Sequence, residues 1–305
     1  MLNFMCRMTF AAIAAATALS PLKAQQVPGR DLFLFPLGSM AEAPALASVA
    51  GGGFWNPATI ALSKGDRYLF SADALHTPID QGISAQLGTV AVRLRERFTL
   101  GASIAQSGVG DLIRTDTDPQ SFGDEIPYSS TIYSAVAAAR AGSTTVGLAY
   151  RYRSGRVDLA RGWVGSFDVG ATVDRPRGLP FRAAVSSFLL SPSRRAERAS
   201  GVAALEGYLP VSGEHDVRTG VSYQLNEGGG DERYVYASGR IGILDLRGGV
   251  ARQQDFGFPT TRLRVGMGLR YQTYVVGIAR EDGTAGLGAT YQFLLSTIIP
   301  ERKSP

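Results

Sequence analysis

Hydrophobic and polar residues alternate with a period of two along most of the chain that follows Lys64. Between residues 145 and 153, for example, large apolar and aromatic side chains share one face, and small residues and arginines occupy the other. The same alternation returns at residues 217–225 and 262–271. Because successive side chains of a strand point to opposite faces, this pattern predicts strands that each have one apolar face.

Fourteen such segments can be counted. They are predicted at residues 66–75, 82–94, 97–107, 129–140, 143–153, 161–173, 180–189, 199–209, 214–225, 232–243, 244–253, 260–270, 272–281 and 284–295. Short turns and longer polar loops alternate between them, a layout typical of an outer-membrane barrel, whose even strand number brings both termini to the short-turn, periplasmic side. The predicted fold is therefore all-β, a transmembrane antiparallel β-barrel of about 14 strands with a short N-terminal plug that contains a helical turn.

A soluble β-sandwich or propeller also has alternating strands, so the period alone does not identify a membrane protein. Three further features favour the membrane barrel: a leader followed by a chain without cysteine, strands long enough to cross a bilayer at a tilt, and aromatic residues near strand ends. The aromatic residues expected at the two membrane interfaces are Phe98, Tyr150, Tyr152, Trp163, Phe181, Tyr208, Tyr223, Tyr271, Tyr274, Tyr291 and Phe293.

Residues 1–24 have the features of a secretory signal peptide. They contain Arg7, an apolar run at residues 10–19 and a small residue, Ala24, before the expected cleavage point. The only cysteine, Cys6, lies in this leader, so the exported chain is expected to contain no disulfide. The expected segments are a signal peptide at 1–24, a plug at 25–65, the barrel at 66–295 and a C-terminal tail at 296–305.

The sequence GGGFWNPATIAL, residues 51–62, is the best candidate for the plug. Its central motif is Phe54, Trp55, Asn56, Pro57 and Ala58. An asparagine side chain can cap a helix by accepting a hydrogen bond from a free backbone N–H, and proline suits the first helical position. The preceding glycines permit a close approach of backbone to backbone. The stretch is too short to form a core of its own, which indicates that a larger structure holds it.

This motif, together with Phe35–Ser39 before it, resembles the N-terminal region of FadL-type fatty-acid transporters and of PorV/PorQ-type outer-membrane proteins. The shared signal is Asn56-Pro57-Ala58, preceded by an aromatic pair as in PorV-like proteins. Thr59 departs from the glycine that many members have after the triplet. The resemblance implies a channel for small hydrophobic molecules or, as the alternative, a non-transporting scaffold that binds cargo and components of a type IX secretion system.

Charged residues fall on the face of the predicted strands that would look into the lumen. They are Asp168, Asp216, Asp245, Arg218, Arg240, Arg247, Arg262, Arg264 and Arg270. One interpretation makes them a selectivity lining for anions or carboxylates. The other makes them a network of arginine–acid pairs that fills the barrel and holds the plug.

The second predicted strand contains a change of hydrophobic phase. Its apolar positions run Ile83, Ala85, Leu87 and resume one residue late at Val90. A shift of one residue reverses the faces of a strand unless a bulge absorbs the extra residue. This predicts a bulge at Gly88 and Thr89. The bulge either only bends the strand or, as the resemblance to FadL-type transporters implies, forms a lateral opening in the barrel wall.

Nothing in the sequence predicts an enzyme, a metal site or another cofactor. The two histidines, His76 and His215, are expected on opposite sides of the membrane, where they cannot share a catalytic site. The net charge of +5 is too small to indicate nucleic-acid binding. The expected location is the outer membrane of a Gram-negative-type cell, with outer-membrane lipids as partners and with a hydrophobic small molecule or secretion components as further candidates.

Overall fold

The computed structural model describes a set of ranges that together cover most of the chain after the predicted leader. They are residues 27–33, 37–47, 51, 53–78, 82–114, 125–190, 200–210, 216–226, 230–255, 258–283 and 288–301. The predicted signal peptide lies outside them.

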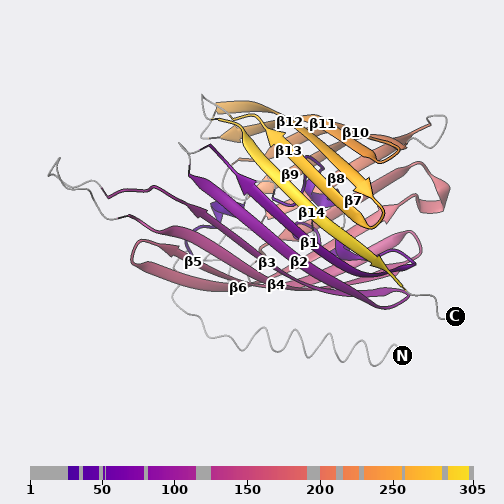
Figure 1. The fold of residues 1–305 in the computed structure, drawn as a ribbon, viewed down its shortest axis with the longest axis horizontal. Coiled ribbons are helices and arrows are strands. Elements are labelled where there is room, and N and C mark those ends of the chain that lie inside the picture. Colours follow the sequence, from indigo (N-terminus) through magenta and orange to yellow (C-terminus); the bar gives the residue numbers. More distant parts are fainter. Residues whose placement is uncertain are drawn as a thin grey trace.

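Fourteen antiparallel strands form one closed barrel (Figure 1). The strands are β1 Asp66–His76, β2 Ile83–Arg95, β3 Phe98–Val109, β4 Tyr128–Ala141, β5 Thr144–Val157, β6 Ala160–Asp174, β7 Phe181–Phe188, β8 Ser200–Leu209, β9 Asp216–Asn226, β10 Glu232–Ile241, β11 Leu244–Asp255, β12 Phe258–Tyr271, β13 Tyr274–Glu281 and β14 Thr290–Pro300. Each strand pairs with its sequence neighbours, and β1 pairs with β14 to close the wall. The predicted fold class is confirmed.

The strand that differs most from its prediction is β14, which begins and ends about five residues later than expected. Alternation continues beyond Phe293, because Leu294 and Ser296 are buried against the interior while Leu295 and Ile299 point outward. Ile299 pairs with Tyr68 of β1. Residues 296–300, expected in the tail, therefore belong to the barrel wall.

The two ends of the barrel differ in their connections. Two-residue turns join β2 to β3, β4 to β5, β10 to β11 and β12 to β13 at one end, here called the short-turn end. The opposite, long-loop end carries the longest connections, although only two residues separate β5 from β6 and β11 from β12 there. Figure 1 shows that β3 to β6 reach further at this end than the other strands. These four strands form a ledge beyond the rim.

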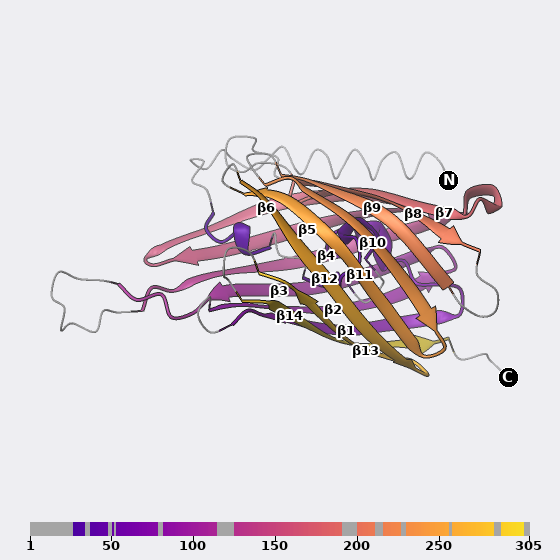
Figure 2. The same ribbon diagram turned by 90° about the horizontal axis from the view of Figure 1, so that it is seen from above.

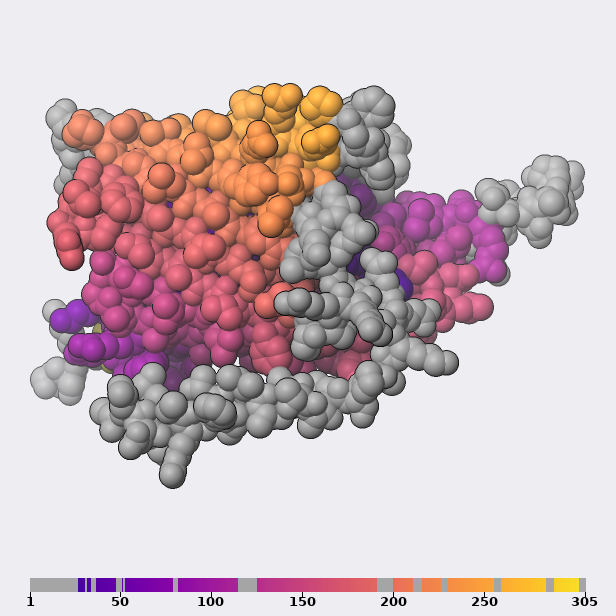
Figure 3. All heavy atoms as spheres, turned by 180° about the vertical axis from the view of Figure 1, so that it is seen from behind, coloured from indigo at the N-terminus to yellow at the C-terminus, as the bar shows by residue number. Residues whose placement is uncertain are grey.

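The outer face of the barrel is apolar across its middle. Exposed aliphatic residues such as Val90, Leu148, Val185 and Leu263 cover it. Figure 3 shows one side of this surface, formed mainly by strands from the middle of the sequence, coloured pink to orange. Outward-facing aromatic residues lie toward both ends. Those toward the short-turn end include Tyr68, Phe98, Tyr271 and Tyr274, and those toward the long-loop end include Tyr133, Tyr152, Trp163, Tyr223 and Tyr291.

The N-terminal segment fills the lumen, as the indigo trace inside the barrel shows (Figure 2). Its described residues include three short 3-10 helices, η1 Asp31–Phe33, η2 Pro44–Leu46 and η4 Pro57–Ile60. This plug begins at the long-loop end, where Val27 and Pro28 contact β5 and β6, and it leaves at the short-turn end to enter β1. The sequence predicts both termini at the short-turn end. The first barrel strand does begin there and the last one ends there. Val27, the first described residue, lies at the long-loop end instead, because the plug crosses the whole lumen.

No helix in the ranges that the structure describes is both long and apolar enough to span a membrane.

Candidate functional site

The motif at residues 54–58 docks on a patch of wall that has no side chains. Gly147 of β5 and Gly170 of β6 are directly paired, and both face η4. A Cβ atom on Gly170 would lie 2.0 Å from Asn56 Oδ1, and one on Gly147 would lie 2.3 Å from the backbone nitrogen of Ala58. Any side chain at either glycine would therefore overlap the plug.

Asn56 caps η4 as the sequence predicts. Its Oδ1 accepts a hydrogen bond from the backbone N–H of Ala58 at 3.0 Å, and Pro57 occupies the first helical position. Its Nδ2 donates to the carbonyl of Ala45 at 2.9 Å. The side chain is fully buried, so Asn56 joins η4 to the segment around η2 as well as capping it.

Replacing Asn56 with alanine is expected to loosen the plug while the barrel stays folded. The change removes a cap and a buried hydrogen bond, each worth about 1 kcal/mol. Chymotrypsin cleavage between residues 54 and 62 should accelerate more than tenfold, because the two losses together amount to about 2 kcal/mol and about 1.4 kcal/mol changes an equilibrium tenfold. Cleavage that is equally fast in Asn56→Ala and in the unmodified protein would contradict this role.

The aromatic residues of the motif form the centre of the interior. Phe54 and Trp55 are each 1% exposed and pack against Phe188 of β7, with ring centroids 5.4 and 4.5 Å away. Trp55 Nε1 donates to the carbonyl of Leu37 at 2.7 Å, so its polar atom is also satisfied. Because rings of this size bury much apolar surface, the cluster ties the plug to one side of the wall.

Arg151 of β5 links the plug to the wall by charge. Its side chain is fully buried, forms an ion pair with Asp168 of β6, and donates to Ser134 Oγ at 2.9 Å. Its Nη2 donates to the carbonyl of Phe54, and its guanidinium lies 5.2 Å from the centre of that ring. One arginine thus joins three wall strands to the plug.

Further wall side chains hold plug carbonyls along the rest of the lumen. Arg153 Nη1 donates to the carbonyl of Pro28 at 2.9 Å, and Tyr234 Oη donates to that of Ala41 at 2.8 Å. At the short-turn end, Arg140 Nη2 donates to the carbonyl of Ala61 at 3.1 Å. The wall therefore holds the plug mainly through hydrogen bonds to plug backbone carbonyl groups. Because these bonds do not use plug side chains, few residues of the plug have to be polar.

The predicted lumen charges all lie on the inner face and form ion-paired groups with residues of the wall and of the plug. Asp168 pairs with Arg151. Asp245 pairs with Arg240 at 2.8 Å and with Arg270 at 3.1 Å. Arg262 and Arg264 pair with Glu232 and Glu281, Arg247 with Glu42, and Arg218 with Asp216 and Glu206 at the longer distances of 3.7 and 3.6 Å. Sequence reasoning missed Arg151, Glu206, Glu232 and Glu281 as members of these groups, although Arg151 shares the inward phase of its strand.

A chamber of about 530 Å³ lies between the plug and the short-turn end. The plug forms its roof through η4 and the residues around Glu42 and Ala47. Six arginines from six strands and one acid of the plug line it: Arg140, Arg182, Arg218, Arg240, Arg247, Arg270 and Glu42. Asp66 and Asp174 contribute at its outer part. The chamber is thus rich in guanidinium groups.

The predicted bulge at Gly88 and Thr89 is absent. Within β2, Gly88 pairs with Ala72 and Ile104 and the register continues through Thr89; the irregularity in the pairing with β3 lies between Arg93 and Arg95. The change of hydrophobic phase has another cause, because Leu87 packs inward against the plug while Val90 points outward. The inner face of β2 is apolar in the first half of the strand, and the outer face is apolar in the second half. The wall therefore has no opening through a bulge here.

Comparison with known proteins identifies a shared architecture only. No family model matches the chain, and no curated protein sequence matches it. Among solved structures, two mutants of the porin from Rhodopseudomonas blastica match with 10% identity, over 76% of this chain and 99% of the porin, with TM-scores of 0.44 and 0.43. The closed antiparallel barrel of this chain rests on its own strand pairing.

Proposed function

We propose that this protein is an integral outer-membrane barrel and a channel for small molecules, gated by its N-terminal plug. The apolar outer wall between two zones of aromatic residues has the arrangement expected of a barrel in a bilayer. The lumen is the path, and displacement of the plug is the opening step. The relationship to FadL- and PorV-type proteins stays part of this proposal, and the position of the Asn56-Pro57-Ala58 motif inside a barrel supports it.

The observation that carries the proposal is the arginine-lined chamber beneath the plug. Arginine rings in pores favour anions, and guanidinium groups bind carboxylates and phosphates through paired hydrogen bonds. Arg140 has no acid within ion-pair distance among the described residues, and Arg218 holds its acids at 3.6 Å or more. These two guanidinium groups therefore have N–H donors that can bind a passing solute. We therefore propose solutes with an anionic group rather than the purely hydrophobic solutes that the family resemblance implies.

Conductance of the purified protein in planar bilayers tests the proposal. In a gradient of potassium chloride, the channel should prefer chloride to potassium, and Arg140→Gln with Arg218→Gln should lower this preference severalfold. Arg156→Gln is the matched control, because Arg156 lies at the long-loop end and, among the described residues, bonds only the carbonyl of Asp158, at 3.0 Å. Cation preference in the unmodified protein would overturn the solute class.

The second candidate function is a cargo-binding scaffold, and the ledge of β3 to β6 favours it. Leu159 at its tip is 85% exposed and Ile113 beside it is 61% exposed, although both are large apolar residues. Contiguous exposed apolar surface marks protein interaction sites, and these two residues are the candidates for such a surface on the ledge. A protein that never conducts until its plug is displaced by mutation would support the scaffold and contradict the channel.

A further inference from the structure

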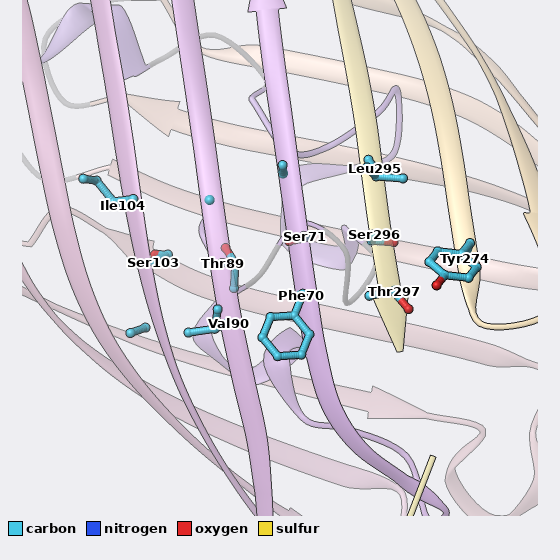
Figure 4. Close-up of a pocket in the computed structure, with 13 residues that line it drawn as sticks. Phe70, Ser71, Thr89, Val90, Ser103, Ile104, Tyr274, Leu295, Ser296 and Thr297 are labelled. Atoms are coloured by element: carbon cyan, nitrogen blue, oxygen red, sulfur yellow. The ribbon is translucent and has the colours of Figure 1, made fainter. Parts of the chain in front are cut away.

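A second cavity lies on the outside of the barrel, where β14, β1, β2 and β3 meet the surrounding medium (Figure 4). Its volume is about 590 Å³. Its outward-facing side chains include Phe70, Ala72, Val90, Ile104 and Leu295, and the strands behind them contribute the inward-facing Ser71, Thr89, Ser103 and Ser296. The barrel is continuous behind it, since β1 pairs with both β14 and β2 without a break between Tyr68 and His76.

The floor of this outer groove is low because small residues occupy neighbouring strands. Ala72 of β1 pairs with Gly88 of β2, so two adjacent strands present almost no side chain to the outside. The flanking partners in the same row are large: Leu295 lies opposite Ala72 on β14, and Ile104 lies opposite Gly88 on β3. The result is a depression two strands wide between two branched side chains.

The next row toward the short-turn end closes the groove with Phe70 and Val90, which are 45% and 48% exposed. Figure 4 shows Phe70 beside Val90 on one side and Tyr274 on the other. The residues that line the groove include no charged side chain. Toward the short-turn end the only small polar side chain on the outward phase of the groove lining is Thr297, paired with Phe70. Larger polar side chains lie in the row toward the long-loop end, where Gln86 of β2 is paired with Gln106 of β3 and both are exposed.

This order of residues matches one leaflet of a bilayer. The paired glutamines lie where head groups would be, and the groove lies one row deeper, where hydrocarbon begins. A cavity of about 150 Å³ holds one benzene molecule, so a groove of about 590 Å³ has room for roughly 20 carbon atoms, which is the size of one long acyl chain.

We propose that the groove at Ala72 and Gly88 is a binding site for one hydrocarbon chain of a membrane lipid, whose head group lies near Gln86 and Gln106. The inference rests on the proposed membrane location of the barrel and is independent of its transport activity. The chain fills a depression that would otherwise leave apolar atoms without van der Waals partners, and burial of apolar surface is the source of its affinity. Gly88 is needed for its missing side chain and not for an unusual backbone, since a Cβ atom there would meet only Ile104 at 3.6 Å.

Photolabelling in lipid vesicles tests this site. The protein is reconstituted with a trace of phosphatidylethanolamine that carries a diazirine in one acyl chain, irradiated and digested, and the labelled residues are mapped by mass spectrometry. Labelling at residues 70–74 and 86–90 should exceed that at Ala203 severalfold. Ala203 is the comparison because it is also small and exposed on the outer face, but it lies between the larger Val185 and Tyr223.

Two groove-filling variants, Gly88→Phe and Ala72→Phe, should each remove this excess, whereas the control Ala203→Phe should leave it unchanged. Even labelling around the whole barrel would overturn the lipid site while supporting the membrane location. Lack of labelling on the groove together with crosslinks between two protein chains would show that a second copy of this chain, and not a lipid, covers the groove. No labelling anywhere would contradict the membrane barrel itself, which separates the two proposals.

Discussion

Replacing Arg151 with methionine is expected to lower the free energy of unfolding by about 3–5 kcal/mol, because it leaves a buried carboxylate without its partner. Asp168 is fully buried and Arg151 is its ion-pair partner. The change also removes the hydrogen bonds to Ser134 and to the carbonyl of Phe54. The measurement is urea unfolding of the protein in lipid vesicles.

The double variant Arg151→Met with Asp168→Asn should regain a large part of this loss, because no charge then stays buried without a counter-ion. Arg114→Met is the matched control. It breaks a pair with Asp158 of which both side chains are 39% exposed or more, and such pairs are worth about 0–1 kcal/mol. If Arg151→Met and Arg114→Met destabilised the protein equally, the central role of Arg151 would be refuted.

Replacing Gly170 with valine is expected to displace the plug and raise the conductance of the channel. A Cβ atom at this position would overlap Asn56 Oδ1 at 2.0 Å, and the close contact is with a buried, hydrogen-bonded side chain that cannot move aside freely. Each 1.4 kcal/mol lost from docking raises the undocked population about tenfold. The barrel should persist, since valine is a favourable residue in strands.

The matched control is Gly207→Val, because a Cβ atom at Gly207 of β8 would meet nothing within 4 Å. Its conductance should equal that of the unmodified protein. Single-channel recordings of the two variants under identical conditions make the comparison. Equal conductance in Gly170→Val and Gly207→Val, with both barrels folded, would show that η4 does not block the path.

The sequence alone determined the strands and the plug cap. Every second side chain of a strand points to the same face, so the environment of each face is visible in the sequence. Fourteen alternating segments were therefore enough to predict the barrel, and most strand ends were right within a few residues. The cap at Asn56 was predictable because it is also a local feature: the two residues that form its hydrogen bond are two positions apart. The inward phase of Asp168, Arg264 and their neighbours also followed from period two.

Only the tertiary structure decided what each face touches. At Leu87 and Val90 the sequence is equally apolar, and the plug on one side and the outer surface on the other determine which residue points where. Glu232 of β10 reaches Arg262 and Arg264 of β12 across β11, because the register of these three strands brings their inward side chains together, which a local pattern does not encode. The direction of the plug and the groove at Ala72 and Gly88 likewise depend on strand register, because they arise from side chains that are neighbours in space and far apart along the chain.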